Sequence, residues 1–383
     1  MSRWVQGILT LLLLSVFIVA GIGWHYSNVL KSDALEIDRS TDPYDVTVVS
    51  VGQGEVTLAA DRGSKPWWSK PGIWGIAWQT PQGDGYAQVG DILSTKDREI
   101  VRTLTHHRGS LSAGQVVRFE SFAFSGDPMT THGIPFDNVT YTSPLGTMPA
   151  WFVPGKSKTW AIFTHGRASN RKEGLRILPM LVELGVPTLL ITYRNDRESP
   201  ENPDGFYHFG ETEWHDLVGA VRYALDHGAE DIVLLGNSMG GAIVLNFLHE
   251  SPLAPRVRAV VLDSPILSFK AVIDFGAAQR GFPAPLTALG EGIAGLRFGI
   301  NWDSQDYLRF AKDIKAPILL FHGEDDTVVP ISTSENLSKL RSDSVTYVQV
   351  PSATHVRSWN VDPKAYTETV RTFLKQETPH SSP

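Results

Sequence analysis

Hydrophobic and polar residues follow three different patterns along the chain, and the first predicts a membrane segment. From Trp4 to Trp24 there is no charged residue, and residues 8–20 are almost wholly aliphatic. As a helix this run would span about 32 Å, enough to cross a bilayer core of roughly 30 Å. Aromatic residues stand at both ends, where membrane–water interfaces collect them. We therefore expect residues 1–26 to form a transmembrane anchor.

A cleaved signal peptide is the alternative for this segment. It would have its basic start at Arg3 and its small residues at Ala20, Gly21 and Gly23. The length of the apolar run favours a retained, single-pass anchor. Positive charge is nearly balanced on its two sides, and we expect the bulk of the protein to lie outside the cytoplasm. The polar residues 27–43 are expected to form a juxtamembrane linker.

Short β-rich runs broken by Gly, Pro and Asp follow, and they predict a small, mostly β domain over residues 44–125. This block holds Trp67, Trp68, Trp74 and Trp78. Together they could form an aromatic binding surface, but packing in a small core or against a neighbouring surface is the favoured interpretation. Residues 106–108 (His-His-Arg) are expected to form an exposed polar turn, because no acidic or histidine partner stands at metal-ligand spacing. The expected strands cover residues 44–51, 54–61, 73–78 and 114–124.

The third pattern, over residues 137–374, alternates strand-like apolar runs with amphipathic helical stretches. The runs are continuously apolar, as parallel strands buried on both faces are. This predicts an α/β fold with a mostly parallel, doubly wound sheet and a site at the carboxyl ends of its strands. We expect residues 266–312 to form a small cap and residues 375–383 a disordered tail. The expected strands cover residues 136–143, 148–155, 158–166, 187–194, 231–238, 257–265, 316–323 and 345–351.

Composition narrows the chemistry that such a fold could carry. The 383 residues include 34 Lys+Arg and 41 Asp+Glu, so a net charge of −7 provides no basic footprint for nucleic acid. A hydrophobic fraction of 42% argues against a disordered chain. There is no cysteine, which excludes thiol nucleophiles, disulfides and Cys-ligated metals. Covalent or acid–base chemistry is left to Ser, Thr, Asp, Glu, Lys and His.

Residues 236–240 read Gly-Asn-Ser-Met-Gly, which fits G-x-S-x-G, and they join an expected strand to an expected helix. In a nucleophile elbow the serine occupies this strained turn, and the helix N-terminus favours developing negative charge. A serine nucleophile needs a histidine to accept its proton and a carboxylate to orient that histidine. Asp326 and His355 follow Ser238 in the chain, each on a loop after an expected strand. These three residues are the expected catalytic set.

With these motifs, residues 137–374 resemble the α/β-hydrolase superfamily, in its branch of compact bacterial serine hydrolases related to prolyl oligopeptidase and serine aminopeptidase domains. The family pattern HG-x-x-D-x-x-V-P reads HGEDDTVVP here, which places the triad acid at Asp326, with Asp325 as the alternative. The family histidine falls on His355, in a loop where Ser352 replaces the usual glycine.

The resemblance also implies an oxyanion hole made by two backbone N–H groups. Met239, directly after the nucleophile, is expected to supply one and Arg167 the other. His165, in the same loop as Arg167, is expected to shape that loop, since His355 fills the role of base. Asp263 ends the strand after the elbow, where some family members carry the acid; the fuller motif favours Asp326.

Arg167, Arg171, Lys172 and Arg176 form a basic cluster in the sequence. Such a cluster could bind a carboxylate or a phosphate. A solvated first turn of the following helix is the favoured interpretation.

These features predict a membrane-anchored serine hydrolase that cleaves an ester, thioester or amide of a small-molecule acyl substrate through an acyl-enzyme on Ser238. No metal, organic cofactor or nucleic-acid partner is expected. The small cap predicts a fairly open site, suited to a modest ester or amide. The alternatives are a serine aminopeptidase-like peptidase and a non-catalytic, membrane-tethered α/β-hydrolase scaffold.

Overall fold

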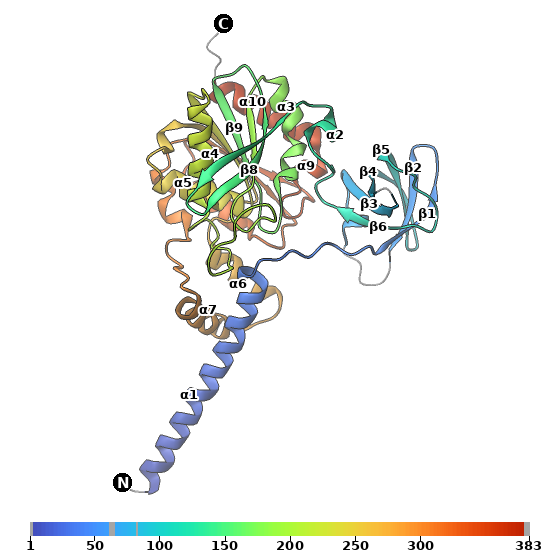
Figure 1. Cartoon of the computed structure of the whole chain (residues 1–383). Helices are drawn as coiled ribbons and strands as arrows, with labels where there is room; N and C mark the ends of the chain where they lie inside the picture. The colour runs from blue at the N-terminus through green and yellow to red at the C-terminus, as the bar shows by residue number, and fades with distance from the viewer. Residues whose placement is uncertain (1–2, 61–65, 82, 379–383) are drawn as a thin grey trace.

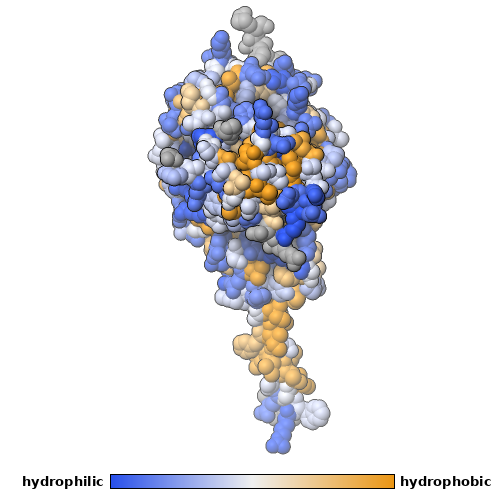
Figure 2. All heavy atoms as spheres, turned by 90° about the vertical axis from the view of Figure 1, so that its right-hand side faces the viewer, coloured by the Kyte–Doolittle hydropathy of each residue, from blue (hydrophilic) through white to orange (hydrophobic). Residues whose placement is uncertain are grey.

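The computed structural model describes residues 3–60, 66–81 and 83–378, and arranges them as a projecting helix, a small barrel and a larger α/β domain (Figure 1). Helix α1 (Arg3–Leu30) runs without a break into a π-helical turn, η1 (Lys31–Leu35). Its apolar half projects from the body as a stalk (Figure 2), and Phe17 is 73% exposed. Among the described residues, this segment is the one helix long and apolar enough to cross a membrane, a test that a signal sequence also passes.

The helical segment continues past Tyr26 into the stretch that was expected to be a linker. Leu30, Ala34 and Leu35 are buried in the main core of the α/β domain. The sequence pattern did not predict this helical turn, because most of its residues are polar. A few apolar side chains are enough to attach one turn to a large domain. The extended connection to the barrel therefore begins only after Leu35.

Residues 46–120 form the barrel. The strands in the described part of the chain close in the order β1-β2-β5-β4-β3-β6, with every neighbouring pair antiparallel. Trp74 and Trp78 are each 1% exposed in its core, as the packing interpretation predicts, and Trp68 is half-buried against that core. The side chain of Trp67 lies outside the described residues. The strands are β1 (Val46–Val51), β2 (Glu55–Ala60), β3 (Trp74–Thr80), β4 (Gly83–Lys96), β5 (Glu99–Arg108) and β6 (Val116–Glu120).

Two of these strands, β4 and β5, are absent from the expected runs. Glycines in this part of the chain resemble turn markers, but Gly75 and Gly85 lie within strands. The ring of Tyr86 covers Gly75 and the ring of Trp78 covers Gly85, so that a Cβ at either position would collide with a ring. Residues 106–108 end β5, so the expectation of a polar turn there is wrong.

The α/β domain contains an eight-stranded sheet within the described residues, in the order β14-β13-β12-β11-β9-β10-β8-β7. The strands from β14 to β10 pair in parallel, and β8 and β7 pair antiparallel at one edge. All eight coincide with expected strands, which confirms the fold class. They are β7 (Asp137–Ser143), β8 (Gly146–Val153), β9 (Thr159–Thr164), β10 (Thr188–Ile191), β11 (Asp231–Asn237), β12 (Val257–Asp263), β13 (Ile318–Gly323) and β14 (Val345–Val350).

Helices cover both faces of this sheet. Leu234 packs in one core cluster and its neighbour Leu235 in the other, because successive strand residues point to opposite faces. α4 and α5 contribute to the first cluster, and α3 and α10 to the second. The helices are α2 (Pro128–His132), α3 (Leu178–Glu183), α4 (Trp214–Asp226), α5 (Met239–Glu250), α6 (Phe269–Gln279), α7 (Ala284–Phe298), α8 (Ile331–Leu340), α9 (Ser358–Val361) and α10 (Pro363–Glu377), with shorter turns η2 (Pro66–Ser69), η3 (Arg171–Arg176), η4 (Ala254–Arg256) and η5 (Tyr307–Asp313).

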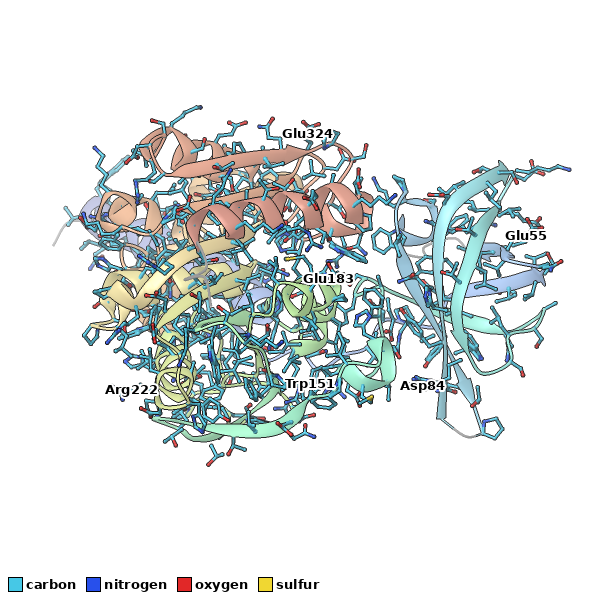
Figure 3. All side chains as sticks on the ribbon, turned by 90° about the horizontal axis from the view of Figure 1, so that it is seen from above. Glu55, Asp84, Trp151, Glu183, Arg222 and Glu324 are labelled. Carbon is cyan, nitrogen blue, oxygen red and sulfur yellow. The ribbon has the colours of Figure 1, made fainter. Side chains whose placement is uncertain are left out.

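Helix α10 continues to Glu377, so the first residues of the expected tail are helical, and residues 379–383 lie outside the described part of the chain. Seen from above, the barrel lies beside the α/β domain, with Glu55 and Asp84 on the barrel and Trp151 and Glu324 on the larger domain (Figure 3).

Asn360, which is fully buried, holds the barrel and the α/β domain together. Its side-chain nitrogen donates to the carbonyl oxygens of Ile73 (2.7 Å) and Ser121 (2.9 Å). Its own backbone oxygen accepts from the N–H of Ile73 at 2.8 Å. The barrel is thereby bonded to α9, which follows the loop of His355.

Candidate active site

Ser238 occupies the turn between β11 and α5, with φ of 51° and ψ of −118°. Such a backbone conformation is strained for a residue with a side chain, and it lifts the hydroxyl out at the end of the strand. The glycines on either side are required by close contacts. A Cβ at Gly236 would collide with the backbone of Gly240, and one at Gly240 with the carbonyl oxygens of Thr164 and His165.

The side chains of Ser238, His355 and Asp326 meet at this edge of the sheet. Nε2 of His355 lies 2.8 Å from Oγ of Ser238, and Nδ1 of the same ring lies 2.8 Å from Oδ2 of Asp326. The alternative acid, Asp325, pairs with Lys70 at 3.5 Å instead. In this arrangement the imidazole can accept the serine proton while the carboxylate fixes the orientation and tautomer of the ring.

Asp326 is a buried carboxylate whose two oxygens face hydrogen-bond donors. Oδ1 accepts from the N–H groups of Val328 (2.8 Å) and Val329 (2.9 Å), and Oδ2 lies against both His355 and His322. Burial disfavours the charged form, but the charge of His355 and the bonds from His322 and His355 outweigh it and hold the pKa of Asp326 below its ordinary value. The carboxylate therefore stays ionised through the neutral and mildly acidic range.

His322 is a site residue that sequence reasoning missed. It is fully buried, with Nδ1 2.7 Å from Oγ of Ser334 and Nε2 3.2 Å from Oδ2 of Asp326. The sequence feature that could have identified it is its position as the first residue of the HG-x-x-D motif, four residues before the proposed acid. It contacts the same carboxylate oxygen of Asp326 as His355 does, and so helps to position the acid.

Two residues with left-handed backbone conformations shape the loop of His355. Ser352 has φ of 61° and Val356 has φ of 55°. Glycine adopts this conformation without steric cost, which explains why the resembling family usually has glycine where Ser352 stands here. Arg176 reaches the loop from η3 and donates from Nη1 to the carbonyl oxygen of Val356 at 3.1 Å.

The loop after β9 lies directly against the nucleophile. A Cβ at Gly166 would stand 3.2 Å from Cβ of Ser238. His165 is fully buried, and its ring nitrogens lie 2.9 Å from Oδ2 of Asp196 and 2.9 Å from the carbonyl oxygen of Gly166. Burial disfavours the charged ring, but Asp196 outweighs this effect and raises the pKa of His165. These contacts agree with the interpretation of His165 as a residue that shapes the loop.

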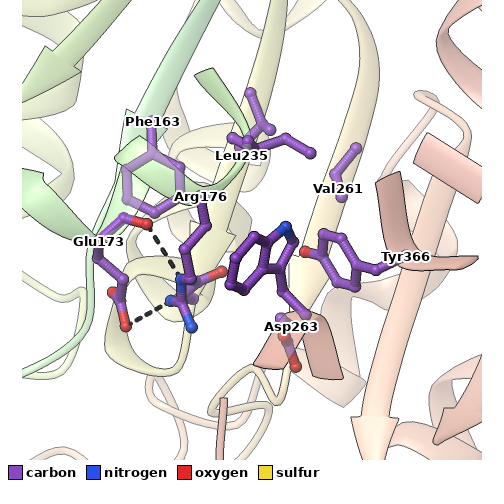
Figure 4. A pocket seen from close by; sticks show the side chains of 10 residues that line it. Phe163, Glu173, Arg176, Leu235, Val261, Asp263 and Tyr366 are labelled. Atoms are coloured by element: carbon purple, nitrogen blue, oxygen red, sulfur yellow. Dashed lines mark hydrogen bonds and ion pairs between the residues drawn. The ribbon is translucent and has the colours of Figure 1, made fainter. Parts of the chain in front are cut away.

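Asp263, the rival acid, lines a small cavity together with Phe163 and Tyr366 (Figure 4). Its Oδ1 accepts from the hydroxyl of Ser358 at 2.8 Å. Burial raises its pKa, in contrast to Asp326. The same cavity contains the ion pair of Glu173 and Arg176, whose side chains are 3.0 Å apart.

The expectation of a solvated basic turn is wrong for Arg171 and Arg176. Arg176 is 7% exposed and bonds to Glu173 and to Oδ1 of Asn360 (3.0 Å). Arg171 is 9% exposed, lies over the ring of Trp151 and pairs with Glu198. Local sequence could not show this, because apart from Glu173 the partners come from distant parts of the chain.

Helices α6 and α7 lie within residues 266–312, the segment expected to form the cap, and α7 packs against the end of α1. Gly23 lies so close to Leu289 and Ile293 of α7 that a Cβ there would collide with both. A cavity of about 280 Å³ lies between α1, η1, α6, α7 and the residues that follow Asp326. In the described part of the chain, no group of three or more His, Asp or Glu side chains could hold a metal ion.

The fold and these motifs define an α/β hydrolase. Residues 152–369 match the alpha/beta hydrolase family, and the chain belongs to that family. Residues 47–120, the barrel, match a separate family described as a domain of unknown function (DUF8805).

Curated relatives match a little more than half of the chain. The chain is 25% identical to the uncharacterized protein YfhR of Escherichia coli (strain K12) over 231 residues, which cover 58% of this chain and 75% of YfhR. It is also 25% identical over 229 residues to the alpha/beta hydrolase domain-containing protein WAV2 of Arabidopsis thaliana, covering 56% and 68% of the two chains. The solved structure of the Pyrococcus furiosus esterase Pf2001 superimposes with a TM-score of 0.54 at 21% identity, covering 66% of this chain and 96% of that one. At this identity the likeness shows the fold.

Proposed function

We propose that the protein is a serine hydrolase that cleaves an ester, thioester or amide through an acyl-enzyme on Ser238. The observation that carries this proposal is the hydrogen-bonded chain from Ser238 through His355 to Asp326, with both contacts at 2.8 Å. A continuous donor–acceptor chain of this kind turns a weakly nucleophilic hydroxyl into a nucleophile.

The proposed reaction has two halves. His355 accepts the proton of Ser238 as Oγ forms a bond to the substrate carbonyl carbon, and the leaving group departs with that proton when its bond to the carbon breaks. His355 then takes a proton from a water molecule as the water oxygen attacks the acyl carbon. When the bond between Oγ and that carbon breaks, His355 returns the proton to Oγ of Ser238 and the free acid leaves. Asp326 stabilises the imidazolium in both halves.

The N–H groups of Met239 and Arg167 are the proposed oxyanion donors. The neighbouring N–H groups are already used, since that of Gly166 donates to Oε2 of Glu173 (3.2 Å) and that of Ser238 to the carbonyl oxygen of Asp263 (3.0 Å). The backbone N–H groups of the next residues, Arg167 and Met239, are therefore the ones proposed to donate to the substrate oxygen. The start of α5 at Met239 adds the positive end of a helix dipole on that side.

We further propose that α1 is retained as a single-pass membrane anchor, with the hydrolase outside the cytoplasm. The unbroken helix from the apolar stalk into the buried residues Leu30 and Leu35 supports retention. Alkaline carbonate should leave the full-length chain in the membrane fraction. Release of a chain shortened near Ala20 would indicate a signal peptide instead.

A fluorophosphonate probe, which reacts with activated serines, tests the enzymatic proposal. The full chain in detergent should be labelled, Ser238→Ala should not, and the control Ser112→Ala in the barrel should be labelled like the wild type. Absence of labelling and of p-nitrophenyl acetate hydrolysis in the wild type would favour a non-catalytic scaffold.

A further inference from the structure

The 280 Å³ cavity is lined by residues of both the proposed membrane helix and the cap. Tyr26, Val29 and Leu30 line it from α1, and Val272, Ile273 and Gly276 line it from α6. Most of this lining is apolar, and the volume is close to the lower end of the roughly 300–1,000 Å³ typical of ligand pockets. The cavity is therefore suited to one hydrophobic group rather than to a whole lipid.

We propose that this cavity holds the acyl chain of an ester that reaches Ser238 from the membrane, so that α1 is part of the substrate pocket as well as an anchor. This inference rests on the proposed hydrolase function. It replaces the fairly open site expected from the small cap, because the sequence pattern gave no sign that α1 would cover the cap.

One loop of the candidate active site borders the cavity, and a second contacts a residue that lines it. Thr327 and Val328 directly follow Asp326 and form part of its wall, and Gln279 of α6 donates to the carbonyl oxygen of Thr327 at 2.9 Å. On another side the guanidinium of Arg167 donates to the carbonyl oxygen of Asp33, a lining residue of η1. An acyl chain bound in the cavity would thus lie near the loops that carry Asp326, the proposed acid, and Arg167, a proposed oxyanion donor.

The charged groups of the lining are paired, which keeps the cavity compatible with an apolar occupant. Asp33 forms an ion pair with Arg280. Glu291, which is 4% exposed, pairs with Lys270 at 2.7 Å. The first pair joins the turn after α1 to the cap and the second joins α6 to α7, and both leave the aliphatic side chains to define the shape of the pocket.

The position of the cap along α1 points to the membrane as the source of the ester. The guanidinium of Arg297 on α7 lies 3.5 Å from the ring centre of Trp24, at the end of the apolar run, where the membrane interface is expected. Leu296 on the same helix is 89% exposed. An exposed leucine at this level would sit in the headgroup region and bring the cavity to the lipid surface.

Two substitutions that narrow the cavity from opposite walls test the proposal. Gly276 lies in α6 with open space around the position of a Cβ, so Gly276→Leu would extend into the cavity without a backbone clash. Val29→Phe would fill it from α1. The matched controls are Gly292→Leu, on α7 with equally open space, and Asn28→Phe, on the exposed side of α1.

The measured quantity is the kcat/KM for p-nitrophenyl octanoate divided by that for the acetate, with full chain in detergent. Gly276→Leu and Val29→Phe should each lower this ratio by about tenfold, because added side-chain volume displaces several methylene groups. The controls should keep the wild-type ratio. Unchanged ratios in both cavity variants, with acetate still hydrolysed, would overturn the pocket and leave the hydrolase standing. A wild type that hydrolyses neither ester would overturn both proposals.

Delivery from the membrane is tested by comparing a long-chain ester in phosphatidylcholine vesicles with the same ester in detergent. Leu296→Asp should lower the vesicle-to-detergent rate ratio several-fold, because a carboxylate would be repelled from the acyl region. The control Leu340→Asp, at a 41% exposed leucine on α8, should not. An equal ratio in Leu296→Asp would show that the ester arrives from solution.

Discussion

The guanidinium of Arg167 donates to the backbone carbonyl oxygen of Asp33, while the carboxylate of Asp33 pairs with Arg280 of the cap. One residue in the turn after α1 is thus bonded to both the loop beside Ser238 and the cap. Helix α1 is connected to the candidate active site by these contacts, and a shift of α1 would act on both. The tight packing of α1 against α7 is the simplest place to test this connection.

Gly23→Val should loosen α1 from α7, because the added side chain would collide with Leu289 and Ile293. Hydrogen–deuterium exchange of residues 284–298 should increase by about tenfold, which corresponds to roughly 1.4 kcal/mol of lost packing. Gly21→Val is the control, since a Cβ at Gly21 meets nothing within 4 Å. Equal exchange in both variants would contradict this packing.

Asp326→Asn should lower kcat for p-nitrophenyl acetate by about 10³–10⁴-fold, because the amide cannot stabilise the imidazolium of His355. Asp263→Asn should lower it by less than about tenfold, since the carboxylate of Asp263 bonds to Ser358 and only its backbone carbonyl, which the substitution keeps, bonds to Ser238. Both rates should be measured on variants with wild-type circular dichroism. A larger effect at Asp263 would move the proposed acid to that residue.

His165 should make stability depend on pH near neutrality. Both ring nitrogens face acceptors, Asp196 and the carbonyl oxygen of Gly166, so the folded state favours the imidazolium and has the higher pKa. This stabilisation is fully present below the unfolded pKa of about 6.5 and is lost as pH rises through the folded pKa. Urea unfolding should show that His165→Gln is less stable by about 1–3 kcal/mol at pH 6.

The same stability difference should shrink as the pH rises through the folded pKa of His165. His227→Gln, at an exposed histidine, is the matched control. A constant difference between wild type and His165→Gln at every pH would mean that folding does not raise the pKa of His165.

Ser352→Gly should raise the free energy of unfolding by about 1 kcal/mol, because glycine relieves the strain of φ at 61° at a smaller cost in chain entropy. Ser338→Gly in α8 should instead lower it by about 0.5 kcal/mol, since helical glycine is unfavourable. Urea unfolding of the two variants provides the comparison. Destabilisation by Ser352→Gly would mean that its side chain has a role that outweighs the strain.

Asn360→Ala should separate the barrel from the α/β domain, because it leaves the carbonyl oxygens of Ile73 and Ser121 and the Nη1 of Arg176 without their asparagine partner. We expect a loss of about 2–4 kcal/mol in stability and faster proteolysis near residue 125. The exposed Asn138→Ala is the control. Unchanged proteolysis in Asn360→Ala would show that other contacts hold the barrel.

Local pattern was enough to predict the strands of the large sheet and the loops that carry Ser238, Asp326 and His355. Buried parallel strands are apolar on both faces and the elbow has its own glycine pattern, so each signal is contained in a few consecutive residues. In β4 the local pattern was misleading. Gly85 resembles a turn residue in the sequence, but it lies within a strand because the ring of Trp78 covers it and leaves no room for a side chain.

By itself, the sequence determined the class of fold, the apolar helix and the order of the three candidate catalytic residues. Only the tertiary structure decided the support of Asp326 by His322, the burial of Arg176 against Asn360 and the seating of α1 on the cap. The physical reason is that these features depend on contacts between residues far apart in the chain. The residues on either side of each contact have no distinctive local sequence, and only the folded backbone brings them together.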